Sequence, residues 1–422
     1  MLLTVATGLC PGKLFGQTSA PVITVQPASL TVAEGSSITV NVTVTGGPIT
    51  GFSWLLGNGS INFVSAQVGG GTGIGGGAGS VVLSLPIDDI GTLYSGTYTV
   101  TVSNSFGSTT SNPATLTVAG SSYLSNFSAR ANVGVNNGVL IEGFTLAYPP
   151  GTVFLPGETI VPQMGSREVI LRGVGPGLAS TFGLSGTLAE PELNFYGSAY
   201  GLIATQAAWP QQPIRGANIP LLLDSVSASA MAAVGAFPLV PGLGDSAISA
   251  APWGGSYTVV LSGANGFTGL ALAEIYDAGN PQSGSLYPMH FSNFSARAIV
   301  GTGGNILIGG FYVAGSTAET LLIRAVGPGL ATMFGLSGVL PNPQLAIFDS
   351  TGKQVSFSVQ GGFSGSGWLL SSVSAQVGGF PLQQMSGDAA ATVTLPPGAY
   401  TVQVSDLRGA SGLALLEVYD VP

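Results

Sequence analysis

Two arginines occupy equivalent places in two nearly identical stretches of this chain. Arg172 begins RGVGPGLASTFGLSG and Arg324 begins RAVGPGLATMFGLSG, and 12 of the 15 positions agree. An arginine beside a Gly-Pro-Gly turn can hold a carboxylate ligand through two parallel hydrogen bonds. It can equally tie the turn to a neighbouring strand, through backbone carbonyls or through a buried acid. We expect the structural role, in which Arg172 and Arg324 pin the turn against the rest of the fold.

Two glutamates are candidate partners for these arginines. Glu274 in LALAEIYD and Glu417 in LALLEVYD stand where an apolar residue would fit the pattern better. A repeated acid and a repeated base in otherwise uncharged strands indicate a partly buried pair, in which loss of one partner costs about 3–5 kcal/mol. Arg130 and Arg297, in the repeated SAR, are alternative partners, and the sequence leaves the pairing open.

Four aspartates also recur in pairs. Asp277 and Asp420 end the last predicted strand of each copy, while Asp245 and Asp388 lie in GDSA and GDAA loops. Calcium takes six to eight oxygen ligands, so two carboxylates per copy could contribute to a calcium site. The chain has no dense D-x-D-x-D cluster, however, and aspartate commonly caps turns. We predict no cofactor, with calcium as the alternative.

Residues for catalysis are scarce. His290 is the only histidine, and its counterpart in the first copy is Tyr123, so a Ser-His-Asp or Cys-His arrangement would depend on one unrepeated residue. A zinc site lacks ligands, because Cys10 is the only cysteine. A carboxylate pair for glycoside hydrolysis remains conceivable, but the 18 Asp and Glu residues are sparse. We expect a protein that is not an enzyme.

Aromatic residues offer a further kind of site. Tyr123, Trp209, Trp253 and Trp368 are candidates for platforms on which sugars stack, although core packing or loop anchoring is the more common use of tryptophan.

The elements that must position these residues are strands. The 422 residues include 66 Gly and 27 Pro, which punctuate alternating runs rich in Val, Thr and Ser. This pattern predicts many turns between short strands, and hence an all-β fold. Charged residues make up only 6%, yet no internal segment supplies the about 20 apolar residues of a spanning helix. We predict no transmembrane segment.

Self-comparison divides the chain. LSNFSARANVG matches FSNFSARAIVG, and GLALAEIYD matches GLALLEVYD, in the same order as the Gly-Pro-Gly stretches. These matches predict tandem domains over residues 120–279 (repeat A) and 287–422 (repeat B), with residues 280–286 as a linker. Runs such as EVILRGV and SYTVVLSG suit a β-sandwich or jelly-roll, and PGLASTFGLSG holds one helical turn.

The first unit, residues 21–119, has a different pattern. GFSWLLGNG places Trp54 in a predicted strand, and YSGTYTVTVSNSFG places Tyr98 beside a predicted corner. These residues and spacings resemble a bacterial immunoglobulin-like domain. The resemblance implies that Trp54 packs in the core and that Tyr98 is the tyrosine-corner residue.

The disulfide of that family is absent here. The resemblance places its cysteine positions at Val40 or Val42 on one strand and at Val100 on another. An apolar pair therefore replaces the cross-link, which suits a chain that folds without oxidants.

Repeats A and B are similar to a domain found in large secreted proteins of environmental bacteria, often behind immunoglobulin-like modules. The motifs that carry the resemblance are SNFSAR, LIRAVGPGL and the closing LALLEVYD. The resemblance implies a secreted or surface context and no defined activity.

Charge and the first residues bear on partners and location. The net charge of −9 without a basic stripe argues against nucleic acid and leaves surface proteins and extracellular polysaccharide as candidate partners. Residues 1–20, MLLTVATGLCPGKLFGQTSA, resemble the end of a secretory signal peptide with its basic start missing. We predict export to the cell surface or the extracellular space.

The predicted function is that of a non-enzymatic structural, spacer or adhesive protein built from three tandem β-sandwich domains. The alternative is a carbohydrate-binding accessory protein of a polysaccharide-degrading system.

Overall fold

The structure is a computed structural model. It describes residues 19–33, 38–46, 49–56, 62–63, 80–87, 95–119, 122–147, 166–217, 221–279, 289–359, 367–383 and 386–421. Residues 1–18 of the predicted signal peptide, with Cys10, and the predicted linker 280–286 lie outside these ranges. The chain forms two compact units, Met1–Gly120 and Ser121–Pro422.

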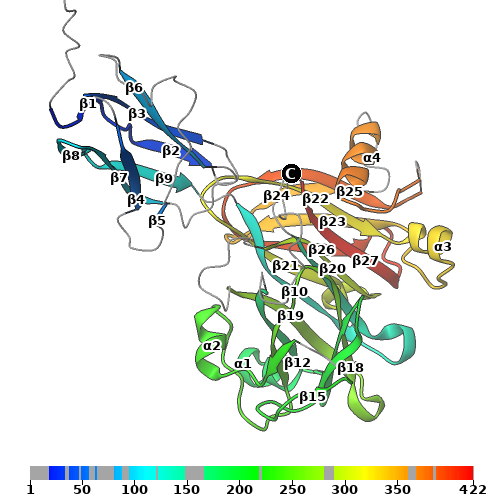
Figure 1. The fold of residues 1–422 in the computed structure, drawn as a ribbon. Coiled ribbons are helices and arrows are strands. Elements are labelled where there is room, and N and C mark those ends of the chain that lie inside the picture. Colours follow the sequence, from blue (N-terminus) through cyan, green and yellow to red (C-terminus); the bar gives the residue numbers. More distant parts are fainter. Residues whose placement is uncertain are drawn as a thin grey trace, which may run out of the picture. The chain divides into compact units, whose positions relative to one another are not determined.

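The first unit contains two sheets (Figure 1). One has the order β1 (Val22–Val25), β3 (Ile38–Thr45), β6 (Val81–Ile87). The other has the order β2 (Leu30–Ala33), β9 (Ala114–Ala119), β7 (Gly96–Asn104), β4 (Gly51–Leu56), β5 (Asn62–Phe63), and β8 (Gly107–Thr110) pairs with β7. Every second residue of β7 from Tyr98 onward is buried, as expected of a strand with one face on a core.

The core of the first unit gathers the residues that the sequence singled out. Trp54 and Val100 are direct partners in the ladder between β4 and β7, and both are buried. Val42 and Tyr98 belong to the same apolar cluster. An apolar core therefore occupies the place where the resemblance put a disulfide.

The second unit is one 18-stranded sheet system whose hydrogen-bonded strands form two runs. The first run has the order β16 (Leu222–Asp224), β17 (Ser246–Ala251), β12 (Glu168–Val174), β19 (Gly269–Gly279), β10 (Tyr123–Val133), β21 (Leu307–Ala314), β26 (Gly398–Asp406), β23 (Pro343–Asp349), β24 (Gln354–Ser358). The second run has the order β15 (Ile214–Arg215), β14 (Gly201–Gln206), β13 (Pro191–Gly197), β18 (Gly255–Gly263), β11 (Leu140–Ala147), β20 (His290–Val300), β27 (Gly412–Asp420), β22 (Glu319–Val326), β25 (Ala389–Leu395).

Short helices lie between the strands. They are α1 (Pro176–Phe182), α2 (Ala228–Ala233), α3 (Pro328–Phe334), α4 (Gly367–Gln376) and the 3-10 turns η2 (Asn136–Gly138), η3 (Ala264–Gly266) and η4 (Gly303–Asn305). The predicted helical turn of PGLASTFGLSG is α1, which begins at Pro176 and ends before Gly183 in a left-handed conformation.

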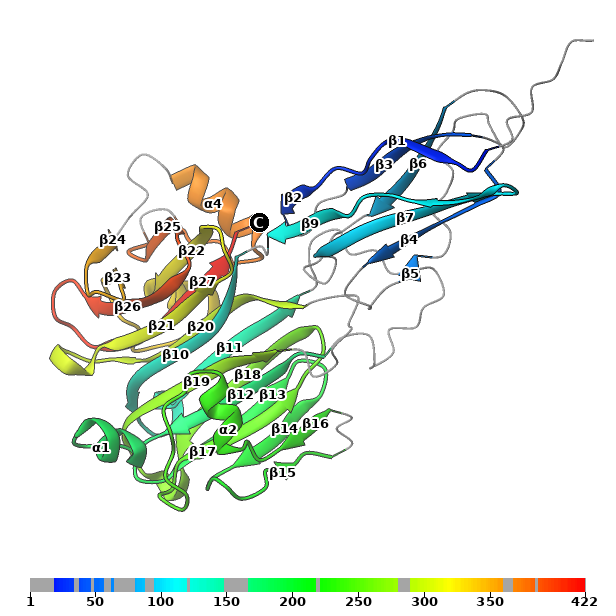
Figure 2. The same ribbon diagram turned by 90° about the vertical axis from the view of Figure 1, so that its left-hand side faces the viewer.

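Each run takes five of its nine strands from repeat A and four from repeat B. Figure 2 shows β10 between β19 and β21, and β11 beside β20. We call these two ladders, β10–β21 and β11–β20, the seam. In a single repeat β10 and β11 would be edge strands with unpaired backbone groups, and the seam satisfies those groups. The sequence suggested two separate sandwiches for residues 120–422, whereas the structure joins repeats A and B in one compact unit.

Two glycines face serines across the seam. Gly143 in β11 faces Ser295 in β20, and Gly310 in β21 faces Ser128 in β10. A Cβ at Gly143 would stand 2.6 Å from Ser295 Oγ, and a Cβ at Gly310 would stand 2.7 Å from Ser128 Oγ. A side chain at either glycine would therefore require the facing serine hydroxyl to turn away.

The prediction of an all-β fold is confirmed. One apolar cluster runs through both repeats and contains the buried faces of β10, β11, β20 and β21. The candidate site residues lie on the strands and turns around this shared core.

Candidate functional site

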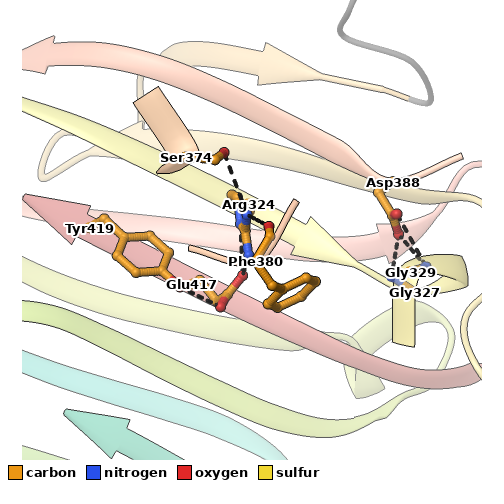
Figure 3. Close-up of polar contacts among 8 residues, drawn as sticks. All are labelled: Arg324, Gly327, Gly329, Ser374, Phe380, Asp388, Glu417 and Tyr419. Atoms are coloured by element: carbon orange, nitrogen blue, oxygen red, sulfur yellow. Dashed lines mark hydrogen bonds and ion pairs between the residues drawn. The ribbon is translucent and has the colours of Figure 1, made fainter. Parts of the chain in front are cut away.

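Arg324 lies in β22 directly across the ladder from Glu417 in β27 and is fully buried (Figure 3). Its Nε and Nη2 donate to Glu417 Oε2 at 2.8 and 2.6 Å, and its Nη1 donates to the carbonyl of Phe380 at 2.7 Å. The Tyr419 hydroxyl donates to Glu417 Oε1 at 2.7 Å. The buried charges therefore neutralise each other and are hydrogen-bonded within the fold.

Repeat A has the same pair with fewer hydrogen bonds. Arg172 in β12 faces Glu274 in β19, and Arg172 Nε lies 3.1 Å from Glu274 Oε2. Among the described residues, none of the three Arg172 nitrogens has a hydrogen bond of good geometry. The guanidinium carbon instead lies 4.3 Å from the centre of the Phe237 ring. Burial raises the pKa of Glu274 above its ordinary value, while the charge of Arg172 acts in the opposite direction.

Aspartates hold the Gly-Pro-Gly turns, a role that we had expected of the arginines. Asp388 Oδ1 accepts hydrogen bonds from the N–H groups of Gly327 at 2.8 Å and Gly329 at 3.1 Å (Figure 3). Asp245 Oδ1 accepts those of Gly175 and Gly177 at 2.9 and 3.0 Å. The first N–H groups of a helix lack partners within it, and a carboxylate can accept them where a guanidinium cannot.

The turn needs its glycines because it lies against another loop. A Cβ at Gly175 would stand 2.0 Å from the carbonyl oxygen of Leu188, and one at Gly327 would stand 2.1 Å from that of Leu340. The repeated Gly-Pro-Gly is therefore a packing requirement of the scaffold.

The second pair of arginines lies on the seam. Arg130 in β10 faces Ile308 of repeat B, and Arg297 in β20 faces Ile141 of repeat A. Arg130 Nη2 donates to the carbonyl of Gly304 at 3.3 Å. Within the described ranges neither forms an ion pair with Glu274 or Glu417, which contact Arg172 and Arg324 instead.

A hollow of about 540 Å³ opens between β10, β19, β21, the end of α2 and Arg167. Arg167, which directly precedes β12, contacts Asp277 through Nε at 2.8 Å and through Nη2, and its Nη1 donates to the carbonyl of Met289 at 2.7 Å. Asn126 Oδ1 accepts the N–H of Asp277 at 3.1 Å. The other lining residues are Tyr123, Ser125, Ala233, Val234, Gly235, Tyr276, Gly279, Tyr312 and Ala314.

The equivalent place in repeat B carries different charges. Glu319 stands where repeat A has Arg167, and His290 stands where repeat A has Tyr123. His290 Nε2 lies 3.8 Å from Asp420 Oδ2. Burial and a hydrogen bond with Asp420 raise the pKa of Glu319 to about 8, so that the two carboxyl groups share a proton near neutral pH.

A buried carboxyl that we did not predict lies in β11. Glu142 is completely buried, and neither of its oxygens has a hydrogen-bond partner of good geometry among the described residues. Burial, and then the charge of Glu274, raise the pKa of Glu142 well above its ordinary value. The signal in the sequence was NGVLIEGFTL, an alternating run in which the acid falls on the apolar face.

The residue of repeat B that is equivalent to Glu142 shows how the buried acid is accommodated in repeat A. Its equivalent is Gly309, where a Cβ would stand 2.4 Å from Leu416 Cδ2. Repeat A has Ala273 in the place of Leu416, and this smaller residue leaves room for Glu142. The two repeats therefore fill the same layer of the core in different ways.

The aspartates suggested for calcium are separated in the structure. Asp245 and Asp388 bind turns, while Asp277 contacts Arg167. In the part of the chain that the structure describes, no three His, Cys, Asp or Glu residues form a group that could hold a metal ion.

The tryptophans proposed as sugar platforms have other contacts. Trp209 is buried, and its Nε1 donates to the carbonyl of Val226 at 2.7 Å. Trp253 packs partly buried against the shared core and against Tyr200. The side chain of Trp368 lies outside the described residues. Tyr123 does line the hollow.

No helix in the described ranges is long and apolar enough to cross a membrane.

Known proteins resemble this chain over part of its length. A search of curated proteins finds no match. Among solved structures, a chimeric titin Z1Z2 carrying a KLER peptide from decorin is 27% identical over 25% of this chain and 98% of its own, with a TM-score of 0.21. The titin M4 domain is 26% identical over 24% of this chain and 97% of its own, with a TM-score of 0.20. The family model described as immunoglobulin domain matches residues 20–104, so the first unit contains an immunoglobulin-like domain.

Proposed function

We propose that this chain is an exported, non-enzymatic surface or extracellular protein with a structural, spacer or adhesive role. The observation that carries the proposal is that the charged residues repeated in both copies bind other groups within the fold. Arg324 and Glu417 bind each other and their neighbours inside the sandwich, and Asp388 binds a turn, with the equivalent residues in equivalent places in repeat A. Duplication of such residues preserves a scaffold, as expected of a module whose task is shape and surface.

The immunoglobulin-like domain supports this proposal by its architecture alone. It adds a second β-sandwich to the chain, and tandem β-sandwiches suit extended or adhesive proteins. Partners would be surface proteins or extracellular polysaccharide.

Export is tested by cell fractionation. The full chain and a variant lacking residues 1–20 are expressed with a C-terminal tag in a bacterial host. The proposal expects the full chain in the medium or in a protease-accessible surface fraction, and the shortened chain inside the cell. Retention of both chains inside the cell would contradict export.

The carbohydrate-binding alternative is favoured by one observation. Three tyrosines, Tyr123, Tyr276 and Tyr312, line the hollow together with hydrogen-bonding side chains. Aromatic faces beside polar groups are the combination that sugar rings require.

A further inference from the structure

We propose that the hollow between β10, α2, β19 and β21 binds one neutral sugar residue, either free or at the end of a longer glycan. This inference rests on the carbohydrate-binding alternative and does not depend on export. The volume of about 540 Å³ falls within the range of small-molecule sites and exceeds what one sugar ring needs.

The polar groups of the hollow are fixed before any ligand arrives. Arg167 grips Asp277 through two nitrogens and is anchored by the carbonyl of Met289. Three of the five N–H groups of the guanidinium are thereby used, and Arg167 also interacts with the Tyr123 side chain. Asn126 is held through Oδ1, and its Nδ2 donates to no group among the described residues. Rigid donors next to carboxylate oxygens suit hydroxyl groups, which both donate and accept hydrogen bonds.

The charge of the hollow favours a neutral ligand. Arg167 and Asp277 form a bidentate ion pair, so the charged groups at this site neutralise each other. Tyr312 is 42% exposed and stands at this site with Tyr123 and Tyr276. An exposed phenol ring offers an apolar face to the C–H groups of a sugar and a hydroxyl to its rim.

Comparison of the two repeats shows which lining residues of the hollow recur at the equivalent place and which do not. Asn126 and Asp277 recur as Asn293 and Asp420. The lining residues that differ are Arg167 and Tyr123 of repeat A and Tyr312 of repeat B, whose equivalents are Glu319 and His290 of repeat B and Thr145 of repeat A. A purely structural arrangement would be expected in both copies. The hollow therefore carries a set of groups that the scaffold does not require.

The test uses the full chain and four probes, the methyl glycosides of glucose, galactose, mannose and N-acetylglucosamine. Binding is measured by saturation-transfer NMR followed by titration. We expect at least one probe to bind, and Tyr312→Ala or Asn126→Ala to weaken its binding by about tenfold or more. The matched changes at the equivalent place, Thr145→Ala and Asn293→Ala, should leave the affinity unchanged.

A second kind of variant fills the hollow, so that the test does not depend only on variants that lose a side chain. Ala233 is exposed at the end of α2, so Ala233→Trp should block the hollow without disturbing the core. Circular dichroism and thermal melting verify that each variant is folded. The inference is overturned if none of the four probes binds, if binding survives Ala233→Trp, or if Asn293→Ala weakens binding as much as Asn126→Ala. The cell-fractionation experiment tests export independently of this binding experiment.

Discussion

Phe127 of repeat A stacks on Phe294 of repeat B, with ring centroids 5.1 Å apart and planes 7° apart. The two residues occupy the same position of SNFSAR in their respective repeats. An equivalent residue therefore meets its own counterpart at the centre of the shared core, as in the interface of a two-fold dimer. The second unit has the organisation of a dimer formed within one chain.

Replacement of Glu142 should make stability less dependent on pH. A folded-state pKa raised by burial means that the stability present below the unfolded pKa, about 4.3, is lost as pH rises through the folded value. We expect Glu142→Gln to raise the free energy of unfolding at pH 8 by about 1–3 kcal/mol and to change it little at pH 4. Urea unfolding at both pH values measures the difference, with the exposed Glu190→Gln as the control. An equal effect at both pH values would show that Glu142 does not titrate as described.

The two arginine–glutamate pairs should contribute different amounts to the free energy of unfolding. Arg324→Met leaves Glu417 buried and uncompensated, and should lower the free energy of unfolding by about 3–5 kcal/mol. Arg172→Met should cost less, because Arg172 makes poorer hydrogen bonds. Chemical unfolding of the second unit measures both. The double variant Arg324→Met/Glu417→Leu should recover much of the loss, and the ranking is contradicted if Arg172→Met costs as much as Arg324→Met.

Removal of Asp388 tests what holds the Gly-Pro-Gly turn. Asp388→Ala leaves the N–H groups of Gly327 and Gly329 without their acceptor, and should lower the free energy of unfolding by about 1–3 kcal/mol. Hydrogen exchange should quicken at these two amides. Asp349→Ala, at an exposed turn, provides the control. Unchanged exchange at Gly327 and Gly329 would rule out this role for Asp388.

Glu319 can be exchanged for the residue that repeat A uses. Glu319→Arg places a guanidinium beside Asp420, as Arg167 stands beside Asp277, and removes the sharing of a proton between two carboxyl groups. We expect the free energy of unfolding at pH 7 to rise by about 1 kcal/mol, as for a partly exposed ion pair. Thermal melting compares Glu319→Arg with Glu319→Gln, which should give a smaller gain in stability. A lower melting temperature for Glu319→Arg would contradict the equivalence of the two places.

The sequence predicted what depends on local pattern. Alternating runs revealed the strands, and the interruption of LALLEVYD by an acid revealed Glu417 as unusual. The partner of Glu417 could be narrowed to Arg297 or Arg324, but only the register of β22 on β27 selects Arg324. Asp388 lies 61 residues from Gly327, and no local pattern connects them.

The seam lay beyond the sequence for a physical reason. The sequences of β10 and β11 would show the same pattern at the edge of a sheet as beside a strand of another repeat. Alternation of apolar and polar residues indicates which face of a strand is buried, and it does not indicate whether its edge is paired. Gly143 and Gly310, which face serines across the seam, resemble ordinary strand glycines in the sequence. Sequence reasoning therefore separated two repeats that the fold joins.

The union of the repeats is tested most directly by cutting the chain between them. A site for a specific protease is inserted within residues 280–286, and the purified protein is cleaved and passed through a sizing column without denaturant. The account predicts that both fragments elute together at the position of the uncut chain and separate only in denaturant. Elution of two separately folded fragments would contradict the shared sandwich.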